Sequence, residues 1–297
     1  MVAAVENGAR PTEAVSHSPT WTRIKDALRR HPGAIVGGLV LLALIAMAAL
    51  APWLGTLDPE AISPIRRLRQ PSAAYWFGTD MLGRDVYSRV VYGARVSLTV
   101  GLSVALLATL AGLAIGLVTG FVRWLDGTIM RVMDGLMSIP SVLLAIALMA
   151  LTKASLQNVI MAIAITEVPR VVRLIRSLVL SLREQPYVEA AIAAGTRAPL
   201  ILTRHILPNT VAPLLVQATY ICASAMLTEA ILSFLGAGTP PNIPSWGNIM
   251  AEGRSLFQIA TFLIFFPGLF LSLAVLSVNM LGDGLRDALD PRLSRNM

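Results

Sequence analysis

Charged side chains inside apolar runs are the residues of this sequence best placed to do chemistry. Glu167 and Arg170 are three residues apart, so on a helix they meet on one face and can neutralise each other. Glu229 has Ser224 and Ser233 near it along the chain and no basic residue within a helical turn. A lone charge at the middle of a bilayer costs roughly 2.5–3.5 kcal/mol, so these side chains should face protein or water. The spacing of Glu167 and Arg170 favours a structural ion pair. For Glu229 we predict a place on a solute pathway, toward its outer gate. Glu167 and Ser224 are further candidates for that pathway.

The sequence contains none of the common catalytic motifs. An ATP-binding loop needs Gly-x-x-x-x-Gly-Lys-Ser/Thr, and neither Lys25 nor Lys153 stands in that context. There is no His-Glu-x-x-His zinc helix and no Gly-x-Ser-x-Gly nucleophile elbow. The single cysteine, Cys222, excludes an intrachain disulfide and a cysteine metal cluster. The histidines lack metal-ligand spacing. We therefore expect a non-catalytic chain with no metal or cofactor of its own.

The composition indicates a membrane protein. Of the 297 residues, 55% are hydrophobic and only 14% are charged, whereas soluble domains carry about 25% charged residues. The net charge is +7. A basic balance can indicate nucleic-acid binding, but in a membrane protein it more often marks loops on the cytoplasmic side. We therefore expect the lipid bilayer, and no nucleic acid, as a partner.

Apolar runs long enough to cross a bilayer predict an all-α fold with six transmembrane helices. A spanning helix needs roughly 20 apolar residues. The fourth run is the least apolar, and Pro169 should kink it. Six spans place both termini on one side, and the distribution of Arg and Lys favours the cytoplasm for that side. The predicted spans are Ala34–Leu54, Val96–Val122, Leu136–Thr152, Leu156–Leu178, Ala212–Leu235 and Ile259–Leu281.

Three glycines recur at every fourth position of the second predicted span. Gly112, Gly116 and Gly120 line one helix face and allow a neighbouring backbone to approach closely. The stripe could contact a second membrane subunit or another helix of the same bundle. Packing within the bundle is slightly favoured.

The segment between the fourth and fifth spans predicts two short helices joined by a tight turn. Pro186 suits a first helical turn, and Gly195 suits a helix end. Pro199 can start a second helix, which Pro208 closes or kinks. A DNA-binding helix-turn-helix would expose Arg, Asn or Gln to the bases, whereas this segment exposes Ala and Gly. An Ala/Gly surface favours close docking to a protein partner.

This segment resembles the EAA loop of ABC importer permeases. The resemblance rests on Glu189-Ala190-Ala191, the glycine at Gly195 and the later Leu207-Pro208. His205 departs from the isoleucine of many relatives, and this departure favours the peptide-transporter branch. Four further stretches resemble the smaller "C" permease of dipeptide and oligopeptide importers: Phe77–Arg89 with Tyr92–Arg95, Leu232–Gly236, Pro244–Gly247 and Leu281–Pro291.

The resemblance implies one membrane half of an ATP-driven importer in a bacterial or archaeal plasma (inner) membrane. Its implied partners are a second permease subunit, two ATP-binding subunits or domains that hold ATP and Mg²⁺, and an extracytoplasmic solute-binding protein. A coupling helix on the cytoplasmic side, between spans four and five, would dock on the ATPase through Tyr187, Glu189, Ala190, Ala191, Gly195, Leu207 and Pro208. An outer loop would help to receive the binding protein through Gly78, Thr79, Asp80, Gly83, Arg84 and Asp85.

Local explanations of two of these stretches remain open. Thr79 or Asp80 could cap the helix that leads into the second span. The glycines on either side of Asp283 could end the sixth span. Dipeptides and oligopeptides lead as solutes, with glutathione, nickel complexes and opines as alternatives. A self-contained secondary transporter or channel, or a membrane anchor for another protein, are the remote alternatives.

The predicted organisation has five parts. A cytoplasmic tail at 1–33, with an interfacial helix or an ordinary basic flank at Trp21–Arg30, precedes a first transmembrane helix at 34–54. An extracytoplasmic loop at 55–95 follows. A core permease domain at 96–285 contains the EAA loop at 186–208, and a cytoplasmic tail at 286–297 ends the sequence.

Overall fold

The computed structural model describes residues 32–289, and its regular structure there is helical throughout. An isolated bridge between Thr79 and Asp85 is the sole β pairing in this part of the chain. The predicted interfacial helix at Trp21–Arg30 lies outside the described residues. Five long helices form the bundle: α2 (Pro32–Ala49), α3 (Val86–Phe121), α6 (Leu156–Arg183), α9 (Leu207–Phe234) and α11 (Phe262–Leu289).

Within the described range, four helical stretches are long and apolar enough to cross a membrane, and a bent pair of helices would make a fifth. The four are α2, α3, α9 with the turn before it, and α11. The prediction of an all-helical, multi-span protein is therefore confirmed. Helix α6 is not among these four stretches, because Glu167 and four arginines make it less apolar. Its 28 residues nevertheless form one helix that continues through Pro169. At about 1.5 Å per residue it is still roughly 42 Å long.

The third predicted span, Leu136–Thr152, is not one helix. The chain forms α4 (Arg123–Met137) and α5 (Ser141–Ala150), which are bent by 90° relative to each other. Pro140 lies at this break, where the ring fixes φ and removes a backbone donor. α5 has ten residues, or about 15 Å, which is half the hydrocarbon thickness. Apolar composition predicted a span here, but it could not show that the backbone turns.

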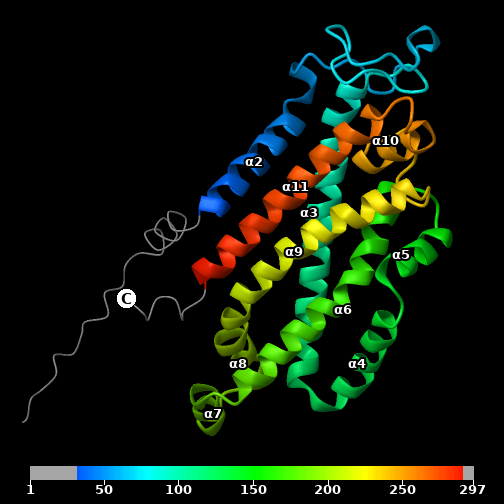
Figure 1. Cartoon of the computed structure of the whole chain (residues 1–297). Coiled ribbons are helices and arrows are strands. Elements are labelled where there is room, and N and C mark those ends of the chain that lie inside the picture. The colour runs from blue at the N-terminus through cyan, green and yellow to red at the C-terminus, as the bar shows by residue number, and fades with distance from the viewer. Residues whose placement is uncertain (1–31, 290–297) are drawn as a thin grey trace, which may run out of the picture.

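Short elements occupy the two ends of the bundle (Figure 1). The loop between α2 and α3 and the helix α10 (Trp246–Gly253) lie at one end, and α7 (Pro186–Ala193) and α8 (Ala198–Ile201) lie at the other. The beginning of α2 and the end of α11 both lie away from the α2–α3 loop. Helix α3 runs the length of the bundle and packs against α6, α9 and α2, while α11 packs against α2, α9 and α10.

The glycine stripe packs inside the bundle, against α6. A Cβ on Gly116 would lie 2.7 Å from the Cβ of Ile175, and one on Gly120 would lie 2.6 Å from the Cβ of Val179. Gly112 meets Val171 in the same way. These distances are far shorter than van der Waals contact, so only glycine fits. Of the two alternatives for this stripe, the structure supports contact within the chain.

The last predicted span continues through its glycines. Helix α11 runs unbroken to Leu289, so the prediction that Gly282 and Gly284 end this helix is wrong. A Cβ on Gly282 would collide with the Thr219 side chain of α9, and one on Gly284 would collide with Ala34 of α2. The two glycines are therefore explained by close packing of α11 against two neighbours.

The second span begins ten residues earlier than predicted, and its cap is Asp85. Helix α3 starts at Val86, and the Asp85 carboxylate accepts a hydrogen bond from the Ser88 backbone N–H at 2.8 Å. The prediction that Thr79 or Asp80 caps this helix is wrong. A carboxylate at this position satisfies a free backbone donor of the first helical turn.

The glycine stripe generates a prediction about stability. Gly116→Ala should lower the unfolding free energy of the purified protein by about 1–3 kcal/mol, because the added methyl group overpacks the α3–α6 contact. The control is Gly135→Ala in α4, where an added Cβ meets nothing within 4 Å. Thermal melting in detergent gives the comparison. Equal melting temperatures for the two variants would contradict the tight contact.

Candidate functional site

The segment predicted to dock on a partner forms a short helix at one tip of the molecule. Pro186 stands in the first turn of α7, as predicted. Gly195 ends the segment with φ at +77°, a conformation that favours glycine, and its N–H donates to the Ile192 carbonyl at 2.9 Å. Thr196 N–H donates to the Ala191 carbonyl at 3.0 Å. These local predictions are confirmed.

Helix α7 is held by one buried side chain and exposes nearly all the rest. Val188 is fully buried against the bundle. Glu189, Ala190 and Gly195 are exposed, and Ala191 is half-buried. Ile192 is 52% exposed. The exposed surface is therefore smooth, small and partly apolar.

The second short helix is not closed by Pro208. Pro199 lies in the first turn of α8, as predicted, but α8 then continues through a π-helical turn, Leu202–Ile206, into α9. Pro208 stands in the first turn of α9. The Asn209 side chain reaches the Tyr187 hydroxyl at 3.4 Å, which ties α7 to the start of α9.

At the opposite end, a buried ion cluster joins the α2–α3 loop to α10. Arg89 donates to the Asp80 carboxylate at 2.6 Å and to both carboxylate oxygens of Glu252 at 2.6 and 2.9 Å. Arg84 donates to Asp80 at 2.6 Å and to Glu252 at 2.8 Å. The side chains of Asp80 and Arg89 are 0% and 1% exposed, and that of Glu252 is 25% exposed. Two cations and two carboxylates thus balance each other in a nearly dry site.

The predicted outer-loop residues mostly hold the loop together. Thr79 Oγ1 accepts from the Arg69 N–H at 2.8 Å and donates to the Arg66 carbonyl. Gly78 and Gly83 have positive φ, and a Cβ on Gly78 would lie 2.6 Å from the Arg69 carbonyl oxygen. The side chains of Thr79, Asp80, Arg84 and Asp85 are all buried. Their part in receiving a binding protein stays a prediction.

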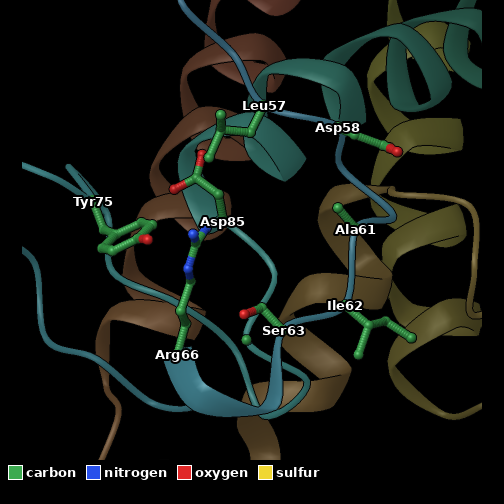
Figure 2. A pocket seen from close by; sticks show the side chains of 9 residues that line it. Leu57, Asp58, Ala61, Ile62, Ser63, Arg66, Tyr75 and Asp85 are labelled. Atoms are coloured by element: carbon green, nitrogen blue, oxygen red, sulfur yellow. The ribbon is translucent and has the colours of Figure 1, made fainter.

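A notch of about 260 Å³ opens on this loop (Figure 2). Arg66 and Tyr75 reach into it from one side, and the Asp85 carboxylate faces them. One Asp85 oxygen, Oδ2, accepts hydrogen bonds from both the backbone N–H and the hydroxyl of Ser88, so that carboxylate serves the helix cap. Asp58 lines another side of the notch.

Glu229 lies in a buried hydroxyl network between α9 and α10. Its Oε1 accepts from the Ser233 hydroxyl at 2.8 Å, while its Oε2 has no protein hydrogen-bond partner. Thr239 and Ser245 extend the network from Ser233, at 3.4 Å each. Glu229 is 0% exposed. Its role on a pathway stays a prediction, and in this conformation its side chain does not reach the surface.

The predicted contact between Glu167 and Arg170 is confirmed. Arg170 Nη1 lies 3.1 Å from Glu167 Oε2. The other oxygen of Glu167 accepts from the Ser224 hydroxyl of α9 at 3.2 Å. Glu167 is buried, whereas the Arg170 side chain is 52% exposed. Two predicted pathway residues, Glu167 and Ser224, are therefore in contact, and Glu229 lies apart from them in a separate network.

Sequence reasoning missed several side chains that brace these sites. Asp126 of α4 accepts two hydrogen bonds from Arg176 of α6, at 2.5 and 2.7 Å, and Asp134 accepts from Arg173 at 2.6 Å. Glu252 completes the outer ion cluster. Each pair joins residues at least 39 positions apart, so no local spacing could reveal it. Among residues 32–289, no group of three His, Cys, Asp or Glu side chains is placed to bind a metal ion.

Comparisons with known proteins identify a family of membrane proteins, in agreement with the helical, multi-span fold. Residues 108–295 match the family of binding-protein-dependent transport system inner membrane components, and residues 20–71 match the N-terminal transmembrane domain of oligopeptide transport permease C. A probable peptide ABC transporter permease of Sinorhizobium fredii is 55% identical over 97% of this chain and 99% of its own length. The chain therefore belongs to the binding-protein-dependent transport system inner membrane components, and it is a multi-pass inner membrane protein.

Two further comparisons bear on solute and fold. A glutathione transport system permease protein of Pectobacterium atrosepticum is 42% identical over 92% of this chain and 90% of its own length. A subunit in the inward-facing structure of the MetNI methionine ABC transporter shares the fold, with a TM-score of 0.58 at 20% identity, over 68% of this chain and 97% of that one.

The outer ion cluster generates the second prediction. Arg89→Met should lower the unfolding free energy by roughly 3–5 kcal/mol, because it leaves the two carboxylates of Asp80 and Glu252 with one cation, Arg84, and so leaves buried negative charge unbalanced. Arg69→Met is the matched control, since Arg69 lies in the same loop and is exposed. Melting temperatures of the two purified variants give the test. If the ion cluster does not stabilise the fold, the two variants will melt at the same temperature.

Proposed function

We propose that this chain is one of two permease subunits of an ATP-driven importer and performs no catalysis itself. It would cross the membrane six times, through α2, α3, the bent pair α4–α5, α6, α9 and α11, with both termini in the cytoplasm. Two ATP-binding subunits or domains would hold ATP and Mg²⁺. The positions of the start of α2 and the end of α11, both away from the α2–α3 loop, support this orientation.

The observation that carries the proposal is the exposed Ala/Gly surface of α7. This helix projects from the tip of the bundle with one buried anchor, Val188, and offers Ala190, Ala191 and Gly195 to a partner. An added Cβ on Gly195 would meet nothing within 4 Å in the chain itself, so the space beside it is free for another protein. Small side chains allow a helix to sit deep in a cleft. We infer that this cleft belongs to the ATPase, with Tyr187, Glu189, Leu207 and Pro208 at its margins.

The outer loop is proposed to help receive the solute-binding protein. Its buried residues, Asp80, Arg84 and Asp85, would keep the loop rigid, and its exposed residues, such as Asp58 and Arg66, would make the contact. The readout is stimulation of ATP hydrolysis by the binding protein, measured on loop variants that melt normally. Normal stimulation in all such variants would remove the receptor role.

The solute is proposed to be a dipeptide or oligopeptide. Similarity to a peptide permease at 55% identity supports this choice, and a glutathione permease at 42% identity supplies the alternative. Glutathione is itself a peptide with free carboxylates, so it is the first alternative. Nickel complexes and opines are the further alternatives as solutes. Specificity would rest largely on the separate binding protein.

Reconstitution of the complex with its ATPase and binding protein tests the function. ATP should drive uptake of a labelled dipeptide into proteoliposomes, and uptake should stop without the binding protein. Ala190→Arg should abolish most of this coupled uptake, because a long charged side chain cannot enter the same cleft as a methyl group. Ala190 is exposed, and Ala190→Ser is the control of similar volume.

Three results would contradict the proposal. Normal uptake by an assembled Ala190→Arg complex would remove the docking role of α7. Proton- or sodium-driven uptake by this chain alone would favour a secondary transporter or channel, and an ATPase that binds without transport would favour a membrane anchor.

Glu229, Glu167 and Ser224 are proposed to belong to the pathway. For Glu229 this requires a state in which α9 and α10 separate, because its side chain is now fully buried. Glu229→Gln preserves the acceptor for Ser233 and removes the charge, so it should change uptake or ATPase coupling at an unchanged melting temperature. Ser233→Ala removes the Oε1 partner without removing the charge and is the control. Unchanged transport in Glu229→Gln would assign the residue to structure alone.

A further inference from the structure

The middle of α6 carries an arginine that would be costly against lipid if the helix crosses the membrane. Helix α6 spans Leu156–Arg183, so Arg170 lies close to its midpoint. The Arg170 side chain is 52% exposed in the chain. The hydrocarbon core is about 30 Å thick, so a residue at mid-depth lies roughly 15 Å from either interface. An arginine side chain is too short to carry its guanidinium over that distance.

Arg170 belongs to a polar stripe on α6. Thr166, Arg170, Arg173 and Ser177 follow one another at spacings of four, three and four residues, so they share one helix face. Arg170, Arg173 and Ser177 are exposed, and Thr166 is half-buried. The two hydroxyls also donate to carbonyls of their own helix, and Arg173 is paired with Asp134 of α4 at 2.6 Å, so Arg170 carries the argument.

Two of the three large apolar residues exposed on α6, Met161 and Ile165, lie on a different face, while the third, Leu180, lies about one turn beyond Ser177 on the face of the stripe. At about 3.6 residues per turn, Met161 and Ile165 stand across the helix from Arg170. They are 51% and 39% exposed. One helix therefore shows an apolar face suited to lipid and, separately, a charged face that is not.

The Arg170 side chain is held on one side and free to bind on the other. Its single ion pair places Nη1 3.1 Å from Glu167 Oε2, at an angle that does not make a hydrogen bond. Glu167 is itself oriented by Ser224 of α9. A guanidinium has five N–H donors in a planar fork, so one loose contact leaves most of them available.

We propose that the α6 stripe of Thr166, Arg170, Arg173 and Ser177 lines the water-filled pathway and that Arg170 receives the carboxylate of the solute in transit. This inference rests on the proposed function. It identifies the residues that would line the pathway and the side chain that would bind the solute. A guanidinium binds a carboxylate through two parallel hydrogen bonds, which is geometry that lysine lacks. Every peptide with a free C-terminus has at least one such carboxylate. Glu167, nearly buried behind Arg170, holds the arginine in place and does not meet the solute.

Cysteine accessibility in the assembled complex tests the water-lined wall. Cys222 is buried and is the chain's one cysteine, so Cys222→Ala gives a clean background. Single cysteines at 166, 170, 173 and 177 should react with a membrane-impermeant, charged thiol reagent at least tenfold faster than cysteines at Met161 and Ile165. Excess dipeptide, added together with binding protein and ATP, should slow the thiol reaction of the cysteine at position 173, because the solute would then occupy the pathway. Equal rates on the two faces would overturn the proposal, whether lipid or the second permease covers the stripe.

A comparison of solutes tests the carboxylate contact. Uptake of a dipeptide and of its C-terminal amide is measured in wild type, Arg170→Lys and Arg170→Gln. The acid-to-amide ratio of uptake rates should fall about tenfold or more in Arg170→Gln, as expected for loss of a charged hydrogen bond. It should fall less in Arg170→Lys. The binding protein's own preference enters each ratio equally and cancels when the variants are compared with wild type, and an unchanged ratio would overturn the contact.

These results separate the inference from the proposed function. Cysteine labelling needs no transport, so it reports on the wall even if the complex imports another solute. A complex that imports peptides but labels equally on both faces contradicts the stripe alone. A wild-type complex without ATP-driven uptake contradicts the proposed function instead.

Discussion

The close contact between α3 and α6 is the interaction on which the rest of the bundle depends. Three glycines bring the α3 backbone against Val171, Ile175 and Val179, with no room for a methyl group between them. Because lipid is as apolar as the helix surfaces, helices in a membrane associate through such close packing rather than through the hydrophobic effect. α3 also contacts α9 and α2, so its position relative to α6 determines where the other helices can lie. The same device recurs where Gly282 and Gly284 of α11 meet α9 and α2.

The two ends of the bundle are built in opposite ways. At the outer-loop end, buried charges and positive-φ glycines hold irregular chain in one conformation, and α10 is tied to it through Glu252. At the other end, α7 has a single buried anchor and a capped terminus. Rigidity suits a platform that another protein must recognise. A small, exposed helix suits an element that moves together with a partner.

Charged side chains of α6 join it to neighbouring helices. Arg176 and Arg173 pair with the two aspartates of α4, and Arg183 donates to the carbonyl groups at the end of α3, at 3.1 and 3.3 Å. These arginines make α6 the least apolar of the predicted spans, yet each has a partner within the bundle. Arg170 differs, since its one partner is loose and half of its side chain is exposed. A charge kept at mid-helix without full neutralisation is expensive in lipid and useful beside water.

The sequence by itself determined the features that depend on neighbouring residues. Pro186, Gly195 and the Ala-rich run between them specify α7, and the three-residue spacing of Glu167 and Arg170 specifies their contact, because helical geometry converts short spacings into proximity. Composition alone indicated a helical membrane protein. The tertiary structure decided the rest. It assigned the glycine stripe to α6, replaced Thr79 and Asp80 by Asp85 as the helix cap, and bent the third span at Pro140. It also brought Glu252 to Arg84 and Arg89 across more than 160 residues of chain. Such contacts depend on how whole helices pack, and packing partners far apart in the chain leave no periodic signal in one sequence.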